Sequence, residues 1–594
     1  MSGPAKPDRP DPVLKSIRQR FADGLTQFVE TQRLRTAHAE AIPQLALAGI
    51  VCGIASGAVI ILFRLVVENV QAGFLPAGVD EAYEDLSMTY RFVIPLVGGV
   101  AIGVLLQLLP IEDRQVGVVH VMERLEYHQG YLPFKNALVQ FIGAGLSIIS
   151  GHSVGREGPS IHLGAAAGSL FARRLGLPNN SIRTLVGCGV AAAIAAGFNT
   201  PLAGVILAME VVLMEYTIVG FTPIILAAVS ATMLSRAVYG EAPAFSVPAF
   251  DWTSIAELPY VLLMGLAIGV LAALFIALLL RFSRMRPDYP IWLRTTLAGL
   301  LVGVLALPAP AIMGVGYDTV TSALVGDFAL SALLLIVVAK LLATTIGLGL
   351  GLPGGLIGPT LVIGATAGGA AGMLAELLGA DTSYHGFYAM LGMGAMMGAT
   401  LQAPLAALIA LLELTANPKV ILPGMVAVVS AALVARVVFG KTSVFRMIMQ
   451  TRGLDYRNDP VSQALRRVGV ASVMDRDIAR LPRQITRPMA LELLKDEPRW
   501  VLVREESDTV ALLPATDLAR YLNDNDTETI DLLAIPARRR DLSATTILAT
   551  LQETHEILTR SGTEAVYVTG AHGEARNKIY GVLTRDDLEK SYRL

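Results

Sequence analysis

Residues 151–160 read Gly151-His152-Ser153-Val154-Gly155-Arg156-Glu157-Gly158-Pro159-Ser160, and this polar, glycine-rich run lies between two strongly apolar segments, 136–150 and 161–175. Both segments have the composition of membrane helices. An ionisable group at membrane depth is costly unless it faces protein or a water-filled cavity, so Arg156 and Glu157 mark a candidate functional site. The glycines allow non-helical backbone there, and a helix that begins at Pro159 would point its free N–H groups at an anion. The run therefore predicts an anion site inside a membrane domain.

Two other interpretations of this run stay open. Residues Gly151 to Gly155 match G-x-S-x-G, the nucleophile elbow of serine hydrolases, which needs a strand before it and a helix after it. The preceding segment, 136–150, is apolar with interleaved glycine and no alternation, and this pattern does not predict a strand. An intramembrane hydrolase that uses Ser153 is one alternative, and an ordinary loop between two spans is the other.

Composition places the whole chain among polytopic membrane proteins. Of its 594 residues, 53% are hydrophobic and 16% are charged, and the mean hydropathy is +0.57. The net charge of −2 gives no indication of a nucleic-acid partner. The two cysteines, Cys52 and Cys188, lie in apolar helical sequence and are predicted to be small core residues without a disulfide or a metal.

The distribution of charge divides the chain into three parts. Residues 1–43 are rich in Lys and Arg, 44–452 form an apolar membrane domain, and 453–594 have the composition of a soluble protein. The basic leader is followed by polar residues, so it does not resemble a signal peptide, and the positive-inside rule places the amino terminus in the cytoplasm. We expect a multi-pass protein of a cell's inner or plasma membrane, in contact with lipid, with both termini cytoplasmic.

The apolar segments of the membrane domain are uneven in length. Many are shorter than the roughly 20 residues that a helix needs to cross a bilayer, which predicts broken or re-entrant helices. The expected spans are 44–75, 91–109, 136–150, 158–175, 183–196, 201–214, 221–238, 257–281, 293–308, 328–347, 359–376, 387–400, 404–414 and 419–439.

The membrane domain also repeats itself. Gly155-Arg156-Glu157-Gly158-Pro159 is matched 200 residues later by Gly355-Leu356-Ile357-Gly358-Pro359. Pro201-Leu202-Ala203 is matched by Pro404-Leu405-Ala406, and a glutamate, Glu210 or Glu413, follows each proline by nine residues. Corresponding broken helices in two halves predict a binding site at the interface of an inverted repeat, near the middle of the bilayer.

These motifs, together with Phe198-Asn199-Thr200-Pro201-Leu202-Ala203-Gly204 and Gly351-Leu352-Pro353-Gly354-Gly355, resemble the CLC family of chloride channels and chloride/proton antiporters. The resemblance covers about 44–452, with repeat halves of about 44–239 and 256–439. It implies an all-α fold of two inverted halves, and a homodimer with one pore per subunit. It also implies that Glu157 is the external gate, whose carboxylate competes with anions for a pore site and carries the proton.

The resemblance further implies an anion pathway built largely from backbone N–H groups. Its expected residues are Val116, Gly117, Gly155, Arg156, Gly158, Gly355, Leu356, Ile357 and Phe445. We expect Arg156 to serve as a structural counter-charge rather than as a ligand of the anion.

Four positions depart from the family pattern. The first anion loop aligns with Gln115–Val119, just before a helix expected to begin near Val121, so that Val116 replaces the usual serine. Phe445 takes the place of the pore tyrosine, and Ile357 that of a phenylalanine. Without the two hydroxyl groups, chloride selectivity is expected to weaken by about 1 kcal/mol or more per missing hydrogen bond. The inner proton glutamate of many antiporters aligns with Val211.

Val211 favours a passive anion channel or an uncoupled conductor, and a chloride/proton antiporter remains the alternative. Glu210 and Glu413 are predicted to serve helix packing or the subunit interface. Three histidines, His120, His152 and His162, flank the pore loops, as structural residues or as residues that tune the pore. Lys340 lies in an apolar helix, and we expect it to add positive potential to an inner vestibule or to reach the membrane interface.

The carboxyl-terminal part resembles a pair of CBS domains, about 466–524 and 528–594. Such pairs commonly bind an adenine nucleotide, and the resemblance implies that Thr584 meets phosphate and Asp587 meets ribose. A dimerisation domain without a ligand is the alternative, and no cofactor is required. The chain as a whole is expected to be a conductor of chloride or other small anions and not an enzyme. A nucleotide sensor whose membrane part is only a scaffold is a further alternative.

Overall fold

The computed structural model describes residues 36–38, 41–75, 82–242, 245, 255–285, 288–377, 385–454, 459–505, 508–571 and 578–592. Residues 1–35 and 39–40 of the expected leader, and residues 455–458, lie outside these ranges. The chain divides into two compact units. The membrane unit comprises Leu45–Ala172 and Ile182–Arg457, and the carboxyl-terminal unit comprises Asn458–Leu594 with two short pieces from earlier in the chain.

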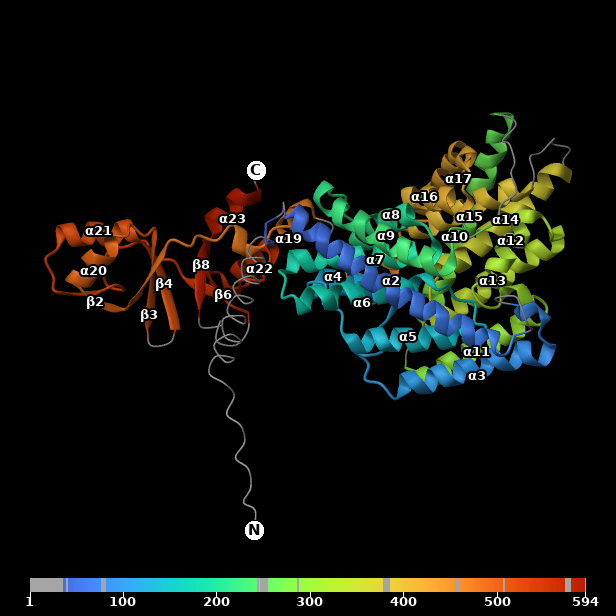
Figure 1. Cartoon of the computed structure of the whole chain (residues 1–594), viewed down its shortest axis with the longest axis horizontal. Coiled ribbons are helices and arrows are strands. Elements are labelled where there is room, and N and C mark those ends of the chain that lie inside the picture. The colour runs from blue at the N-terminus through green and yellow to red at the C-terminus, as the bar shows by residue number, and fades with distance from the viewer. Residues whose placement is uncertain are drawn as a thin grey trace, which may run out of the picture. The chain divides into compact units, whose positions relative to one another are not determined.

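The described residues of the membrane unit form helices and the loops that connect them (Figure 1). Among the described residues, eight helices are long and apolar enough to cross a membrane. Its helices are α2 (Ile42–Ala72), α3 (Met88–Gln107), α4 (Gly117–Tyr127), α5 (Phe134–Ile149), α6 (Glu157–Arg174), α7 (Asn179–Phe198), α8 (Pro201–Leu207), α9 (Ile218–Tyr239), α10 (Leu258–Ser283), α11 (Ile291–Ala306), α12 (Tyr317–Val325), α13 (Leu330–Leu350), α14 (Ile357–Leu377), α15 (His385–Leu401), α16 (Pro404–Thr415), α17 (Ile421–Leu433) and α18 (Val444–Thr451).

Several of these helices are too short to cross a membrane alone. Helix α4 has 11 residues, α8 has 7 and α12 has 9, whereas a span takes about 20. Single turns of other geometry connect them, including the π-helices η2 (Ala208–Leu213) and η6 (Val434–Val438). The prediction of broken helices is confirmed, as is the all-α polytopic fold with a smaller α/β unit.

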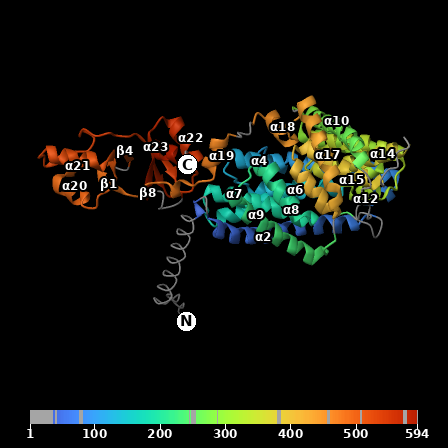
Figure 2. The same cartoon turned by 90° about the horizontal axis from the view of Figure 1, so that it is seen from above.

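Glycines of the sequence repeat bring equivalent helix pairs together. A Cβ atom at Gly164 of α6 would lie 2.6 Å from Ala193 Cβ of α7. A Cβ atom at Gly364 of α14 would lie 2.8 Å from Met393 Cα of α15. Figure 2 shows α14 and α15 side by side. The two glycines, 200 residues apart, therefore allow the same close helix packing in both halves.

Each half also caps a helix of the other half. The Glu210 carboxylate accepts hydrogen bonds from Leu405 N and Ala406 N, at 3.3 and 2.6 Å, where α16 begins. The Glu413 carboxylate accepts from Leu202 N and Ala203 N, at 3.0 and 2.7 Å, where α8 begins. A carboxylate satisfies the free N–H groups of a helix start and complements its dipole. The packing role predicted for the two glutamates is confirmed.

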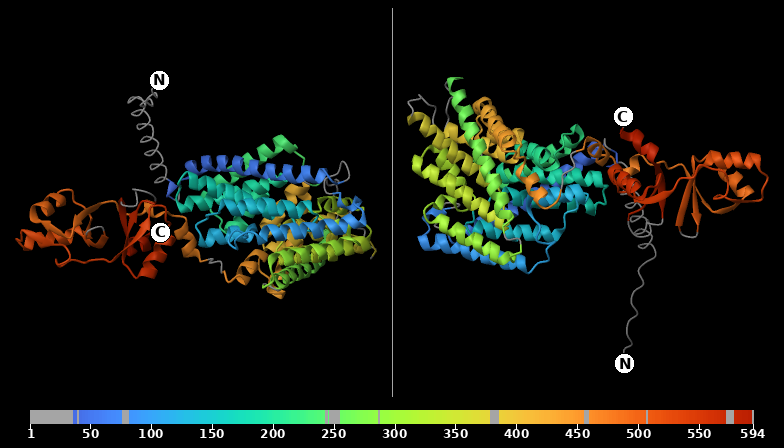
Figure 3. Two further views of the ribbon diagram at one scale, coloured as in Figure 1. Left: turned by 90° about the horizontal axis from the view of Figure 1, so that it is seen from below. Right: turned by 180° about the vertical axis from the view of Figure 1, so that it is seen from behind.

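The long helix α2, blue in Figure 3, runs along the outside of the membrane unit. It exposes apolar side chains such as Leu47 and Leu62, which are 67% and 55% exposed. Its other face is buried through small residues, including Gly49 and Gly53. An apolar outward face of this kind fits contact with lipid.

The carboxyl-terminal unit contains two copies of one small α/β arrangement. In each, a first strand pairs parallel with a second, and the second pairs antiparallel with a third. The first copy contains β1 (Ile478–Pro482), β2 (Gln484–Thr486), α20 (Arg487–Leu494), β3 (Trp500–Glu505), β4 (Asp508–Pro514), α21 (Ala515–Asp524) and β5 (Thr529–Asp531). The second contains β6 (Leu542–Thr546), α22 (Leu551–Ser561), β7 (Ala565–Thr569), β8 (Ile579–Thr584) and α23 (Arg585–Tyr592).

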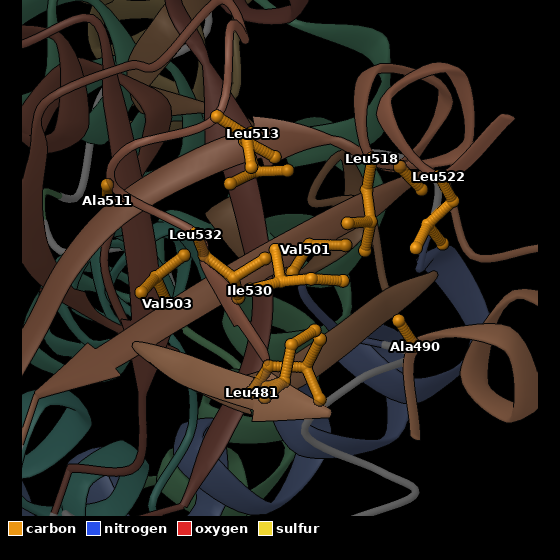
Figure 4. Close-up of a cluster of buried hydrophobic side chains, with 13 residues drawn as sticks. Leu481, Ala490, Val501, Val503, Ala511, Leu513, Leu518, Leu522, Ile530 and Leu532 are labelled. Atoms are coloured by element: carbon orange, nitrogen blue, oxygen red, sulfur yellow. The ribbon is translucent and has the colours of Figure 1, made fainter. Parts of the chain in front are cut away.

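Figure 4 shows the core of the first copy. Val501 and Val503 alternate along β3 and face Leu513 of β4 and Leu518 of α21, all of them buried. The second copy ends with the strand β8, which is followed directly by the helix α23. This duplicated arrangement is consistent with the predicted CBS pair.

Candidate functional site

The two glycine loops of the repeat meet in the middle of the membrane unit. Gly155 N donates to Gly355 O and Gly355 N donates to Gly155 O, both at 2.7 Å. Gly158 lies against the same contact, because a Cβ atom there would lie 2.8 Å from Gly355 Cα. The N–H groups of Gly155 and Gly355, both predicted for the anion pathway, therefore hold the two loops together.

Glu157 is the first residue of α6 and is only 2% exposed. Its carboxylate lies over glycines of both loops: a Cβ atom at Gly358 of the second loop would be 2.8 Å from Oε1, and one at Gly155 of the first loop would clash with Oε2. Oε1 accepts a hydrogen bond of 2.5 Å from the hydroxyl of Tyr317. Oε2 accepts none from the residues that the structure describes. A buried carboxylate is thus held at the junction of the two halves with one oxygen unsatisfied.

The two residues next to Glu157 in the chain line two different cavities. The large cavity, about 980 Å³, is lined by Gly158, and the small cavity, about 200 Å³, is lined by Arg156. Glu157 itself lines neither. Seven of the residues predicted for the anion pathway line the large cavity: Val116, Gly117, Gly158, Gly355, Leu356, Ile357 and Phe445.

The charges around the large cavity are mostly positive. Its lining includes one glutamate, Glu123, and four arginines, which are Arg114, Arg284, Arg294 and Arg452. A cleft lined by charges of one sign raises the local concentration of the opposite ion. The large cavity is therefore suited to collect anions.

Arg156 faces the small cavity and not the carboxylate beside it in the chain. Its NH1 lies 3.7 Å from Glu68 Oε1, and its guanidinium lies over the rings of Phe198 and Tyr317, at 5.3 and 4.8 Å from their centres. Glu68 also pairs with Arg64, at 3.1 Å. These contacts agree with the counter-charge role expected of Arg156.

The first anion loop is fixed by two amide side chains that the sequence analysis does not include. Gly117 N donates to Gln140 Oε1 at 2.6 Å, and Asn136 Nδ2 donates to Glu112 O and Gln115 O, each at 2.9 Å. Helix α4 begins at Gly117, so the expectation of a start near Val121 is wrong by about one turn. Asn136 and Gln140 are four residues apart in an apolar helix. Two polar residues on one face of such a helix are the sequence signal that could have indicated their contact with the loop.

Lys340 neither lines a described cavity nor reaches a membrane interface. It is 0% exposed, and its Nζ donates to Ile312 O, Gly314 O and Val315 O at 3.0, 3.0 and 3.2 Å. The expectation that Lys340 reaches the membrane interface is therefore wrong, whereas its contribution to the potential of an inner vestibule stays a prediction. The ammonium group instead holds the loop that leads into α12, because only a strong donor can satisfy several buried carbonyls at once.

Ser153 lacks the surroundings of a nucleophile. The segment before it is the helix α5, and its Oγ is 2.8 Å from Thr344 Oγ1. Neither ring nitrogen of its neighbour His152 has a hydrogen-bond partner among the described residues. His120 Nδ1 lies 2.9 Å from His162 Nε2, so these two histidines bond to each other. The strand that the hydrolase alternative requires is absent at this position.

Val211 lies in η2 and is 3% exposed, away from the lining of both cavities.

In the carboxyl-terminal unit, the Thr584 hydroxyl donates to Asp587 Oδ2 at 2.6 Å, and Asp587 N donates to Thr584 Oγ1 at 3.2 Å. The pair predicted for nucleotide binding is therefore adjacent, at the junction of β8 and α23.

Comparison with known proteins agrees with this arrangement. Residues 98–436 match the family model described as voltage gated chloride channel. A ClcB-like protein of Ralstonia nicotianae is 33% identical over 432 residues, which cover 70% of this chain and 99% of that protein. The H⁺/Cl⁻ exchange transporter ClcA of Vibrio cholerae is 29% identical over 323 residues, covering 53% of this chain and 69% of that protein.

Solved structures give the same result. A slow cyanobacterial Cl⁻/H⁺ antiporter matches with a TM-score of 0.61 and 26% identity, over 69% of this chain and 97% of that one. A eukaryotic CLC transporter matches in fold over 91% of this chain, with a TM-score of 0.59 and 19% identity. The paired glycine loops, the glutamate between two cavities and these matches lead to one conclusion: the chain belongs to the CLC family of voltage-gated chloride channels.

Proposed function

We propose that this protein moves chloride or another small anion across a membrane, with Glu157 as the gate of the pathway. One observation carries the proposal. Arg156 lines the small cavity, Gly158 lines the large cavity, and Glu157 between them in the chain lines neither. The buried carboxylate in the middle stands between two spaces that an anion could enter. We assign the large cavity to the cytoplasmic side and the small cavity to the opposite side.

The gate acts through competition between two anions. The start of α6 presents free N–H groups and the positive end of its dipole, and these favour either a carboxylate or a chloride ion. Protonation of Glu157 removes its charge, so the neutral side chain no longer competes and an anion can take its place. The unsatisfied Oε2 supports this mechanism, because a carboxylate with few partners can leave its position at little cost.

Selectivity for chloride is expected to be weak. Val116 and Phe445 both line the large cavity, and neither side chain can donate a hydrogen bond. Gln140 occupies the N–H group of Gly117, which is then not available to an anion. Each missing hydrogen bond lowers the advantage of one anion over another by about 1 kcal/mol.

Transport without proton coupling is the first candidate mode, because Val211 places a buried apolar side chain where a proton-carrying glutamate is expected. Strict chloride/proton exchange is the second candidate. It is favoured by the relatives, since the protein from Vibrio cholerae is named an exchange transporter and the cyanobacterial structure is described as an antiporter.

The remaining assignments are also proposals. The protein acts as a homodimer in a cell's inner or plasma membrane, with both termini in the cytoplasm. The carboxyl-terminal unit regulates transport through an adenine nucleotide bound near Thr584 and Asp587. Isothermal titration of the full chain with ATP tests this role, and a chain that binds no nucleotide would have a purely structural carboxyl-terminal unit.

The decisive experiment is anion efflux from liposomes with simultaneous recording of external pH under a chloride gradient. Anion flux without proton movement supports the uncoupled mode, and uphill proton movement supports the exchanger. Glu157→Gln is expected to leave flux high and to remove its dependence on pH. If the pH dependence of Glu157→Gln is the same as in the wild type, Glu157 is not the gate.

A further inference from the structure

The hydroxyl of Tyr317 is the side-chain donor that meets the Glu157 carboxylate. Tyr317 is the first residue of α12, and 160 residues of sequence separate it from Glu157. Tyr317 also lines the small cavity, so one residue contacts both that cavity and Glu157. None of the residues predicted for the anion pathway has a hydroxyl group. Tyr317, which the prediction does not include, brings a hydroxyl group to Glu157.

The ring of Tyr317 is held from several directions. Phe198 and Phe245 meet it edge to face, with ring centres 6.0 and 5.4 Å away. The guanidinium of Arg156 lies 4.8 Å from its centre. A cation over the ring withdraws electron density from the phenol, which makes its hydroxyl a stronger hydrogen-bond donor. The position of the hydroxyl is therefore fixed whether or not Glu157 is in contact with it.

The loop before Tyr317 repeats the anion loop of the first half. Val116 precedes α4, which begins at Gly117, and Val315-Gly316 precedes α12. Gly117 and Gly316 share the same left-handed backbone, with φ of 83° and 85°. Lys340 anchors the second loop through its carbonyl groups. The two halves thus present equivalent loops, one to each cavity, and the second of them carries the hydroxyl.

We propose that the Tyr317 hydroxyl is an anion ligand, which binds the Glu157 carboxylate when the gate is closed and a transported anion when Glu157 has left. The proposal rests on Glu157 being the gate, and it adds a selectivity-determining residue to that pathway. The carboxylate oxygen marks the place that the anion takes, 2.5 Å from the hydroxyl for an oxygen and correspondingly farther for the larger chloride ion. Val116 and Phe445 supply no side-chain donor to the large cavity, and Tyr317 supplies one beside the small cavity.

Tyr317→Phe tests the proposal, because it keeps the ring and its aromatic contacts and removes only the hydroxyl. In the Glu157→Gln background, chloride affinity is measured by isothermal titration and by the chloride concentration that gives half-maximal flux. Loss of a hydrogen bond to a charged partner is expected to weaken chloride binding about tenfold. Tyr260→Phe in the same background is the matched control, because the Tyr260 hydroxyl also donates a hydrogen bond in a membrane helix, to Ala371 O. Its chloride affinity should match that of Glu157→Gln alone.

A second readout uses the chain with Glu157 intact. Tyr317→Phe should raise basal flux at neutral pH, because the closed carboxylate loses its donor. Unchanged chloride affinity in the double variant, or unchanged basal flux in the single one, would overturn the proposal. Absence of anion flux in Glu157→Gln would instead contradict the proposed function, and calorimetry would still test whether Tyr317 binds chloride.

Discussion

Gly155 and Gly355 exchange two backbone hydrogen bonds of 2.7 Å, although 200 residues separate them in the chain. Each belongs to the Gly-x-x-Gly-Pro turn of its own half, so equivalent residues of the two sequence repeats contact each other in the structure. The pair forms a short antiparallel bridge in an otherwise helical unit. Beyond each glycine the backbone turns into α6 or α14, whose first N–H groups have no carbonyl partner within the helix.

Gly355→Ala is expected to disrupt this junction. The added methyl group would lie 2.6 Å from Gly158 N and 2.9 Å from Gly155 O, and backbone atoms cannot easily move aside. We expect a loss of stability of about 1–3 kcal/mol and a large fall in anion flux. Thermal unfolding in detergent and liposome efflux measure the two effects. Gly145→Ala is the control, since its methyl group would meet nothing closer than 3.8 Å; it should leave flux unchanged and should not lower the unfolding temperature.

Val116→Ser should raise the preference for chloride over nitrate. The new hydroxyl would line the large cavity and donate to an anion there, with a gain of about 1 kcal/mol, or several-fold in relative permeability. Competition of the two anions in liposome flux gives the ratio. Val118 lines the same cavity two residues further along the chain, and Val118→Ser is the control that should leave the permeability ratio unchanged. An equal change in both variants would contradict the alignment of this loop.

Val211→Glu addresses coupling. If the wild type moves anions without protons, a titratable group at this buried position should introduce measurable proton movement against an imposed chloride gradient. Val211→Gln provides a control of similar size that cannot carry a proton at neutral pH. Equal proton movement in the two variants would show that this position does not belong to a proton route.

Lys340→Met is expected to act on the gate from a distance. Three carbonyl groups ahead of α12 would lose their donor, and a buried carbonyl without a partner costs about 1–3 kcal/mol. The loop that positions Tyr317 should loosen, so basal flux should rise as in Tyr317→Phe, together with a lower unfolding temperature. A variant with lower stability but unchanged basal flux would separate Lys340 from the gate. Thr345→Val, on the same helix, controls for the loss of a polar group that bonds only within α13.

The sequence predicts those parts of the site that carry a local signature. Glu157 and the glycines around it lie in a short polar run between apolar segments, and the 200-residue repeat points to their partners. The same repeat marks Glu210 and Glu413 as packing residues, although the helix starts that they cap are known only from the structure. For these features, composition and spacing alone contain the necessary information, because the physical requirement is imposed by the membrane.

Tyr317, Gln140 and Lys340 could not be placed in the same way. Each acts through a contact with a distant segment, and a single sequence does not show which distant residues meet. Lys340 illustrates the difficulty: a lysine in an apolar helix usually extends to the interface, and only the three carbonyls around it explain why it remains buried. The start of α4 was misplaced because its first turn lies within the expected loop.

The reciprocal caps have a consequence for how the protein is made. The N–H group of Ala203 bonds to a glutamate that follows it by 210 residues. At a synthesis rate of about 5–20 residues per second, this glutamate leaves the ribosome some 10–40 s after α8 does. The first half must therefore wait in the membrane with an open helix end until the second half has been inserted. Biogenesis of the membrane unit is completed late, when both halves are present, and a chain truncated before Glu413 should be recognised by quality control as unfinished.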